Sequence, residues 1–189
     1  MRHWLLTILV IASAAQPGAQ RADQQAIEAE TLQHFQALVR LDTSSPPGNE
    51  TIAVEYLKGV LEKEGIAVQV FATDPKRANL VARIKGNGKK RPILVMGHTD
   101  VVTVDPKKWT HPPFGAVREG GHIYGRGTVD DKDNVVAGLM LMLMLKRGNV
   151  ALDRDVIFLA ESGEEGAPHV GAQFMICLLY TSPSPRDRG

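Results

Sequence analysis

The chain has 189 residues, enough for one domain or for a part of a larger one. Hydrophobic residues make up 43% and charged residues 23%, which excludes a wholly disordered chain. The 22 Lys and Arg and 21 Asp and Glu give a formal net charge of +1, so the charge favours no nucleic acid partner and no anionic membrane. A single cysteine, Cys177, excludes an intrachain disulfide and a cysteine-based zinc site. Any bound metal must be held by His, Asp and Glu.

The N-terminal residues have the layout of a secretory signal peptide. Arg2 and His3 precede an apolar run at 4–12, and small residues follow at 13–15. The run is shorter than the about 20 residues that span a bilayer. We therefore expect residues 1–19 to be a signal peptide, the mature protein to be exported to the periplasm or medium, and no stable membrane span to remain after cleavage. A buried N-terminal helix is the alternative.

Two helices are predicted next. Apolar side chains recur on one face over residues 24–40, and Asp23 can cap the start of that helix. A loop with two prolines and a glycine follows at 43–49. The second helix is expected at about residues 50–64, with Gly65 as its C-terminal stop. Both helices have an apolar face that should point inward.

Strand patterns follow the helices. Residues 66–71 alternate between apolar and polar, as a half-exposed strand does, and residues 79–85 read as a second strand. The segment Gly-Asn-Gly at 86–88 turns the chain. Residues 93–96 are continuously apolar, which predicts a central strand buried on both faces.

The pattern then continues with a long loop, a buried helix at 132–146 and a short buried strand at 156–160. Strands that alternate with helices favour an α/β fold, here a three-layer sandwich with a mostly parallel central sheet.

Chemically useful side chains collect where the buried strands end. His98 and Asp100 directly follow the strand at 93–96. Residues two apart at a strand end point the same way, so the imidazole and the carboxylate can face one cleft. A carboxylate beside a histidine fixes the tautomer and raises the basicity of a metal ligand. Taken alone, such a pair is more often structural.

Two further acidic pairs have an ordinary explanation as well as a functional one. Asp130 and Asp131 precede the buried helix, where carboxylates commonly act as caps. The glycines at 125–127 do not make a phosphate loop, because the third fingerprint glycine and a Gly-Lys-Ser/Thr are missing. Glu164 and Glu165 follow the strand at 156–160, at the kind of edge where α/β proteins place ligands, although solvated glutamates are the default.

Together the three segments supply a His, an Asp and a Glu pair, a hard-ligand set suited to zinc or another divalent cation. They resemble the motifs of the aminoacylase/carboxypeptidase-type co-catalytic metallopeptidases, a family that includes glutamate carboxypeptidase, carnosine dipeptidases and succinyl-diaminopimelate desuccinylase. The resemblance covers about residues 24 to 176. Its matching segments are MGHTDVV at 96–102, the Trp-to-Phe loop at 109–114, GRGTVDDK at 125–132 and GEEG at 163–166.

The resemblance implies a two-metal hydrolase of peptide or N-acyl amide bonds, with zinc, or else cobalt or manganese, as the cofactor. It makes His98 a ligand of one ion, Asp130 the carboxylate that bridges both ions, and Glu165 a ligand of the other. Asp100 would be the partner of His98, and Glu164 would be the general base. The substrate would be a peptide or an N-acyl amino acid, and an N-acyl-amino-acid deacylase is the runner-up to a peptidase.

The resemblance also implies a cis peptide bond before Asp131, which itself would be no ligand. The chain departs from the family at Asp133, where glycine is usual, and lacks the downstream acidic ligand, the distal histidine and the small inserted domain. We therefore expect residues 20–176 to be an incomplete catalytic domain of a two-domain family. Residues 177–189 are expected to be an unrelated or disordered tail, and the 189-residue chain to be inactive. A homodimer is expected only of a full-length parent, and a non-catalytic fragment is the competing hypothesis.

Overall fold

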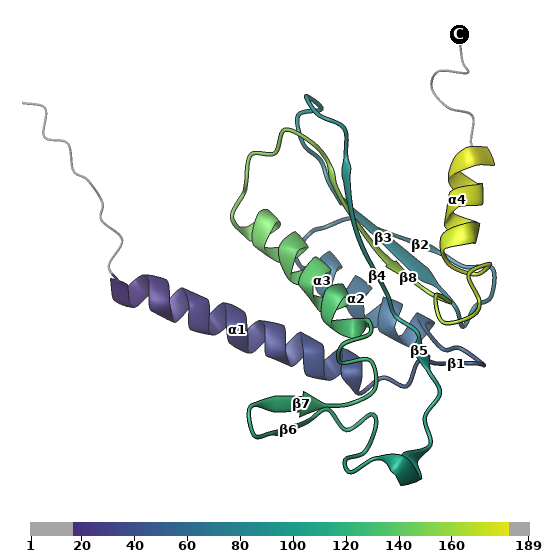
Figure 1. Cartoon of the computed structure of the whole chain (residues 1–189). Coiled ribbons are helices and arrows are strands. Elements are labelled where there is room, and N and C mark those ends of the chain that lie inside the picture. Colours follow the sequence, from purple (N-terminus) through teal and green to yellow (C-terminus); the bar gives the residue numbers. More distant parts are fainter. Residues whose placement is uncertain (1–16, 182–189) are drawn as a thin grey trace, which may run out of the picture.

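The computed structural model describes residues 17–181, and Figure 1 shows how the elements lie. The predicted α/β class is confirmed. The helices are α1 (Pro17–Val39), α2 (Thr51–Lys63), α3 (Lys132–Arg147) and α4 (Ala172–Thr181), with a short 3₁₀ helix at Pro106–Lys108. The strands are β1 (Ser44–Ser45), β2 (Val68–Phe71), β3 (Asn79–Ile84), β4 (Ile93–His98), β5 (Val101–Val102), β6 (Val117–Glu119), β7 (His122–Tyr124) and β8 (Val156–Glu161).

The main sheet has the strand order β2-β3-β8-β4. Strand β4 runs parallel to β8, whereas β2–β3 and β3–β8 are antiparallel, so the described sheet is mixed rather than mostly parallel. The parallel pair needs a long crossover, and α3 lies within it. Because β8 pairs between β3 and β4, the turn at 86–88 does not join two neighbouring strands as a hairpin would.

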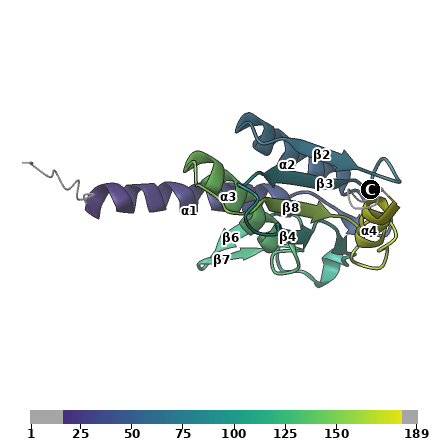
Figure 2. The same cartoon turned by 90° about the horizontal axis from the view of Figure 1, so that it is seen from above.

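Helices cover the two faces of this sheet unequally (Figures 1 and 2). On one face α2 contacts β3, α3 contacts β4 and β8, and α1 packs on α3. The core lies here, with Leu57, Leu80, Leu139 and Phe158 all fully buried. On the other face Met175 of α4 helps to line a hollow of about 370 Å³ over the sheet. Helices α2 and α3 thus form a layer on one face of the sheet, and α4 lies at the hollow on the other face.

Strand β4 corrects one prediction. A central strand buried on both faces was expected at 93–96, but β4 is an edge strand, and Ile93, Leu94 and Met96 are 46%, 52% and 43% exposed. Among residues 17–181 only β8 pairs with β4, so no second neighbouring strand covers the apolar side chains of β4 from solvent. A continuous apolar run predicts a strand but does not specify its neighbours.

The boundaries of the other elements agree with the sequence in part. Helix α2 and Gly65 are as predicted: Gly65 has φ +68° and its N–H donates to the carbonyl of Glu62. Helix α1 begins at Pro17, so Asp23 lies inside the helix and is not its cap. The β6–β7 hairpin was not predicted, although its two-residue turn is Gly120-Gly121 with positive φ at both residues.

The ends of the chain bear on two predictions. Of the predicted signal peptide at 1–19, residues 1–16 lie outside the described residues, and the others belong to α1. Of the predicted tail, residues 177–181 form the last part of α4, and residues 182–189 are outside the described range. Within residues 17–181, no helix combines the length and the hydropathy needed to cross a membrane.

Candidate metal centre

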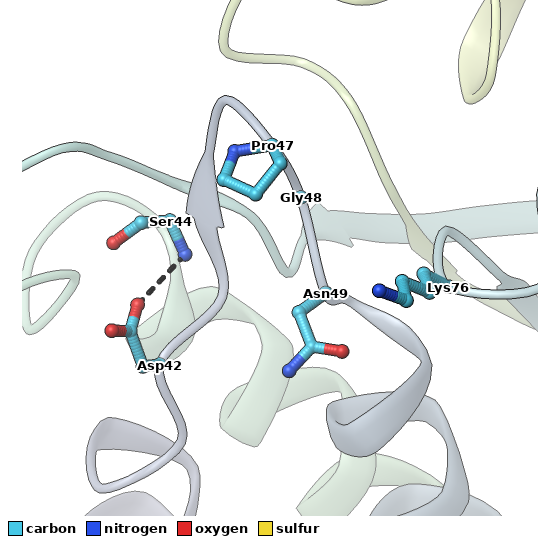
Figure 3. A pocket seen from close by; sticks show the side chains of 6 residues that line it. All are labelled: Asp42, Ser44, Pro47, Gly48, Asn49 and Lys76. Carbon is cyan, nitrogen blue, oxygen red and sulfur yellow. Dashed lines mark hydrogen bonds between the residues drawn. The ribbon is translucent and has the colours of Figure 1, made fainter.

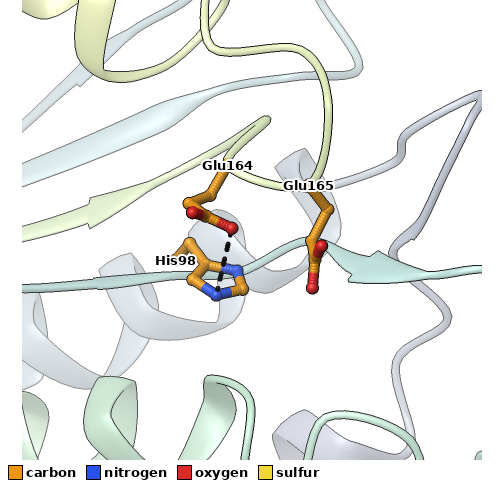
Figure 4. Close-up of side chains that lie close together, drawn as sticks. All are labelled: His98, Glu164 and Glu165. Atoms are coloured by element: carbon orange, nitrogen blue, oxygen red, sulfur yellow. Dashed lines mark ion pairs between the residues drawn. The ribbon is translucent and has the colours of Figure 1, made fainter.

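The parallel pairing of β4 with β8 brings the distant motifs together. His98, the last residue of β4, is the register partner of Glu161, the last residue of β8. The loop that follows β8 therefore starts beside His98, and it carries Glu164 and Glu165 (Figure 4). One ligand atom from each of His98, Glu164 and Glu165 lies within 4.8 Å of the other two. Three side chains predicted to serve one site are thus close together.

Asp130 joins this group from the segment before α3. Its Oδ1 lies 2.9 Å from Nε2 of His98, and Oε2 of Glu164 lies 3.8 Å from the same nitrogen. The side chain of His98 is 9% exposed, whereas those of Asp130 and Glu164 are 71% and 55% exposed. The peptide bond between Asp130 and Asp131 is cis, as the resemblance implied. A buried imidazole therefore faces carboxylates that solvent can reach.

Asp131 is engaged elsewhere. Its Oδ2 accepts a hydrogen bond from the backbone N–H of His98 at 3.1 Å, and its Oδ1 accepts from the side-chain amide of Asn134. It makes no side-chain capping bond to the backbone of α3. Asp131 thus ties the start of α3 to β4.

Asp100 is fully buried and connects both halves of the group. Nδ1 of His98 lies 3.1 Å from the backbone carbonyl oxygen of Asp100 and 3.4 Å from its Oδ1. The carboxylate also accepts the backbone N–H groups of Glu164, at 3.2 Å, and Glu165, at 2.9 Å. The sequence predicted the contact with His98 but not these two bonds, which fix the backbone that carries the glutamates.

The electrostatics of the group favour a cation. Burial by itself lowers the pKa of His98, but hydrogen bonds to Asp100 and Asp130 raise that pKa to about 9. Burial and the nearby charge of Asp130 raise the pKa of Glu165. Burial would also raise the pKa of Asp100, but His98 and the N–H of Glu165 lower it more. Several carboxylates thus surround one histidine, and such perturbed groups cluster at functional sites.

Buried polar side chains that sequence reasoning missed support the loop after β8. Asn79 hydrogen-bonds the backbone at Ser162 and Val170. The hydroxyl of Ser162 donates to the carbonyl oxygens of Arg77 and Ala78, and the hydroxyl of Thr99 donates to that of Glu161. The available signal was an Asn at the start of an apolar strand, since Asn is depleted in strands.

The GRGTVDDK segment also contributes a buried lysine. Lys132 is 1% exposed, and its Nζ donates to the carbonyl oxygen of Leu41 at 2.7 Å. Burial lowers the pKa of Lys132 to about 8. Its Nζ also lies 5.8 Å from the centroid of the Phe114 ring, which belongs to the Trp-to-Phe loop. Lys132 therefore holds the start of α3 against two other segments.

A separate hollow of about 370 Å³ opens beside β1 (Figure 3). Oδ1 of Asp42 accepts the backbone N–H of Ser44 at 3.0 Å at its rim. None of the predicted site residues lines it. The lining residues are Asp42, Ser44, Pro47, Gly48, Asn49 and Lys76.

Comparison with known proteins identifies relatives of this chain. Residues 94–185 match the model of peptidase family M20/M25/M40. A probable succinyl-diaminopimelate desuccinylase of Staphylococcus aureus is 37% identical over 140 residues, which are 73% of this chain and 34% of the relative. The chain thus spans about a third of the length of the curated relatives that it matches.

Two solved structures share the fold of this chain. An M20 family metallo-carboxypeptidase, Sso-CP2 from Sulfolobus solfataricus, has a TM-score of 0.66 and 28% identity, over 78% of this chain and 33% of that one. Human carnosine dipeptidase 1 has a TM-score of 0.65 and 21% identity, over 85% and 38%, a likeness that concerns the fold alone. The resemblance predicted from the motifs is confirmed.

Proposed function

We propose that this chain, whose residues 94–185 match the model of peptidase family M20/M25/M40, is part of a metal-dependent hydrolase of peptide or N-acyl amide bonds. The observation that carries the proposal is the convergence of His98, Glu164 and Glu165, with Asp130 2.9 Å from the same imidazole. An imidazole and several carboxylates are ligands that zinc, cobalt and manganese accept. The donor set therefore fits a divalent ion, and zinc is the ion that we expect.

We assign the roles by position. His98, Asp130 and Glu165 would hold metal, with Asp130 placed to bridge if two ions bind. Glu164 is the exposed member of the glutamate pair and would act as the general base. Asp100 is buried behind the group, where it orients His98 and the backbone of both glutamates. The described residues supply ligands for about one four-coordinate ion, so we expect one zinc per chain.

The chemistry follows from these positions. A divalent ion bound here would polarise the substrate carbonyl and lower the pKa of a bound water. Glu164 would take the proton of the attacking water and pass it to the leaving amine. Asp100 would keep the imidazole of His98 in the tautomer whose Nε2 faces the metal.

Deacylation of an N-acyl amino acid is a second candidate. It is supported by the 37% identity to a probable succinyl-diaminopimelate desuccinylase, whereas the carboxypeptidase relative supports peptide cleavage. A different class, a metal-binding chain without catalysis, is favoured by the small number of ligands among the described residues. Assays of dipeptides and N-succinyl amino acids with a longer form of the protein would separate these candidates.

The test of the metal centre compares two isosteric variants. Glu165→Gln removes a charged ligand oxygen and should weaken zinc binding in calorimetric titration. Glu164→Gln should leave zinc binding near that of the wild type, while kcat of a longer, active form falls by about 10²–10⁴-fold. If both variants keep full zinc affinity and full activity, the two glutamates are solvated surface residues and the proposal is wrong.

A further inference from the structure

The loop that carries Glu164 and Glu165 runs from Ser162, just after β8, to Gly171, just before α4. Its middle is fixed by Asp100, which accepts the N–H groups of both glutamates. Within the loop the N–H of Ala167 also donates to the carbonyl of Gly163 at 2.8 Å. The contacts at the two ends of the loop therefore determine where Glu164 and Glu165 lie relative to His98.

One side chain contacts both ends. Asn79, the first residue of β3, is fully buried, and its Oδ1 accepts the backbone N–H of Ser162 at 3.0 Å. Its Nδ2 donates to the carbonyl oxygen of Val170 at 2.8 Å, and also to that of Phe71 at 3.3 Å. The carboxamide of Asn79 therefore joins the first residue of the loop, Ser162, to Val170 near its end.

We propose that Asn79 is a positioning residue for the metal centre: by closing the loop at 162–171 it holds Glu164 and Glu165 opposite His98. The inference rests on the proposed function of that site. All three hydrogen bonds of the Asn79 side chain go to backbone groups outside the cluster, so it acts through the loop.

The chemistry of the position accounts for asparagine. The start of the loop presents the N–H of Ser162, a donor, and its end presents the carbonyl oxygen of Val170, an acceptor. A carboxamide is a short planar group whose oxygen accepts from the first and whose NH2 donates to the second. An ionised carboxylate has only acceptors, and an aliphatic side chain has neither. Loss of the side chain would also leave buried backbone groups without partners, which is costly in itself. The experiment must therefore separate loop position from general stability.

We would compare Asn79→Ala and Asn79→Asp with Leu80→Ala, a matched control at the next residue of β3. Leu80 is also fully buried but lies in the hydrophobic core and on the opposite side of the strand. Two measurements are made on the 189-residue chain: amide hydrogen exchange without metal, and calorimetric titration with zinc. Asn79→Asp keeps the acceptor for Ser162 and loses the bonds that Nδ2 donates to Val170 and Phe71, so it tests the proposal even if Asn79→Ala does not fold.

Asn79→Ala should accelerate exchange at Ser162, Glu164 and Glu165 and weaken zinc binding by about 10- to 100-fold, the usual effect of losing a residue that supports metal ligands. Asn79→Asp should weaken zinc binding while Ser162 stays protected. Leu80→Ala should lower global stability and leave zinc affinity within about twofold of the wild type.

Unchanged exchange at the loop amides in both Asn79 variants would overturn the inference. So would a loss of zinc affinity in Leu80→Ala that equals the loss in Asn79→Ala, since the effect would then be one of general stability. If Glu165→Gln does not alter zinc binding, the proposed metal site is wrong instead, and exchange in the metal-free protein still decides whether Asn79 holds the loop.

Discussion

The buried ion pair between Arg77 and Glu50 offers a quantitative test of the packing beneath the site. Nε of Arg77 donates to both carboxylate oxygens of Glu50 at 3.1 Å, and Nη2 donates to Oε1 at 2.6 Å and to Oγ of Ser45 at 2.9 Å. Glu50 is fully buried and Arg77 is 7% exposed. Neither charge can be rehydrated without opening this part of the fold.

Arg77→Met should therefore be strongly destabilising. It leaves the Glu50 carboxylate buried without a cation, and breaking a buried pair in this way costs about 3–5 kcal/mol. That is a large share of a total stability of roughly 5–15 kcal/mol. The double variant Glu50→Leu, Arg77→Met removes both charges and should lose much less than Arg77→Met alone, because apolar replacement of a buried pair is often close to neutral.

Urea denaturation of the single and double variants would give the coupling energy. The control is Arg83→Met: Arg83 and Asp155 are 3.5 Å apart at the surface, and loss of such a pair costs less than about 1 kcal/mol. If Arg77→Met were no more destabilising than Arg83→Met, or if the double variant lost as much as the sum of its parts, the account of this pair as a desolvated, coupled unit would be refuted.

Two further predictions concern pH and close packing. The pKa of His98 is raised to about 9 in the metal-free fold, so zinc must displace a proton: zinc affinity should rise by up to about tenfold per pH unit towards pH 9 and then level off, and calorimetry in buffers of different ionisation enthalpy should detect the released proton. Because the pKa of His98 is raised on folding, the protonated imidazole stabilises the metal-free fold below pH 6.5, and this stabilisation is lost as pH rises through 9. Zinc affinity and metal-free stability that both stay constant with pH would contradict this prediction. Gly138→Ala should destabilise by about 1–3 kcal/mol, because the new Cβ would stand 2.4 Å from Cε2 of Phe158. Gly59→Ala, in open space on α2, should instead stabilise by roughly 0.5–1 kcal/mol, and thermal unfolding of both variants would show whether the clash decides the sign.

The sequence predicted helices α2 and α3 well, because their signal is local, whereas α4 was not predicted. Apolar residues recur at helical spacing in α2 and α3, and Gly65 ends α2 with the left-handed backbone that glycine allows. The placement of strand β4 could not be predicted in the same way. Its apolar run is a local property, whereas its one neighbour among residues 17–181, β8, follows it only after a long crossover.

In the candidate site, too, features with a local sequence signal were predicted better than features that depend on distant contacts. The motifs identified His98, Asp130 and the glutamate pair by residue type and order, and the structure brings these side chains together. Of the residues that support the site, Asp100 was predicted as the partner of His98, whereas Asn79 was missed. Asn79 belongs to no motif, and its hydrogen bonds reach the backbone at Val170, 91 residues along the chain, so no pattern around Asn79 reveals them.

The register of β4 on β8 also affects how the site is made. His98 stands opposite Glu161, and Thr99 bonds to the carbonyl of Glu161 across 62 residues of chain. Such contacts form only after the entropy of closing a long loop has been overcome, and contacts of this kind slow folding. The side chains of His98 and of the glutamate pair cannot bind one ion while β4 and β8 are unpaired. A shift of the register by one residue would displace His98 by about 3.3 Å along the sheet. Zinc capture is therefore expected late in folding, and the rate at which a refolding chain acquires metal would report the moment when these two strands have paired in the correct register.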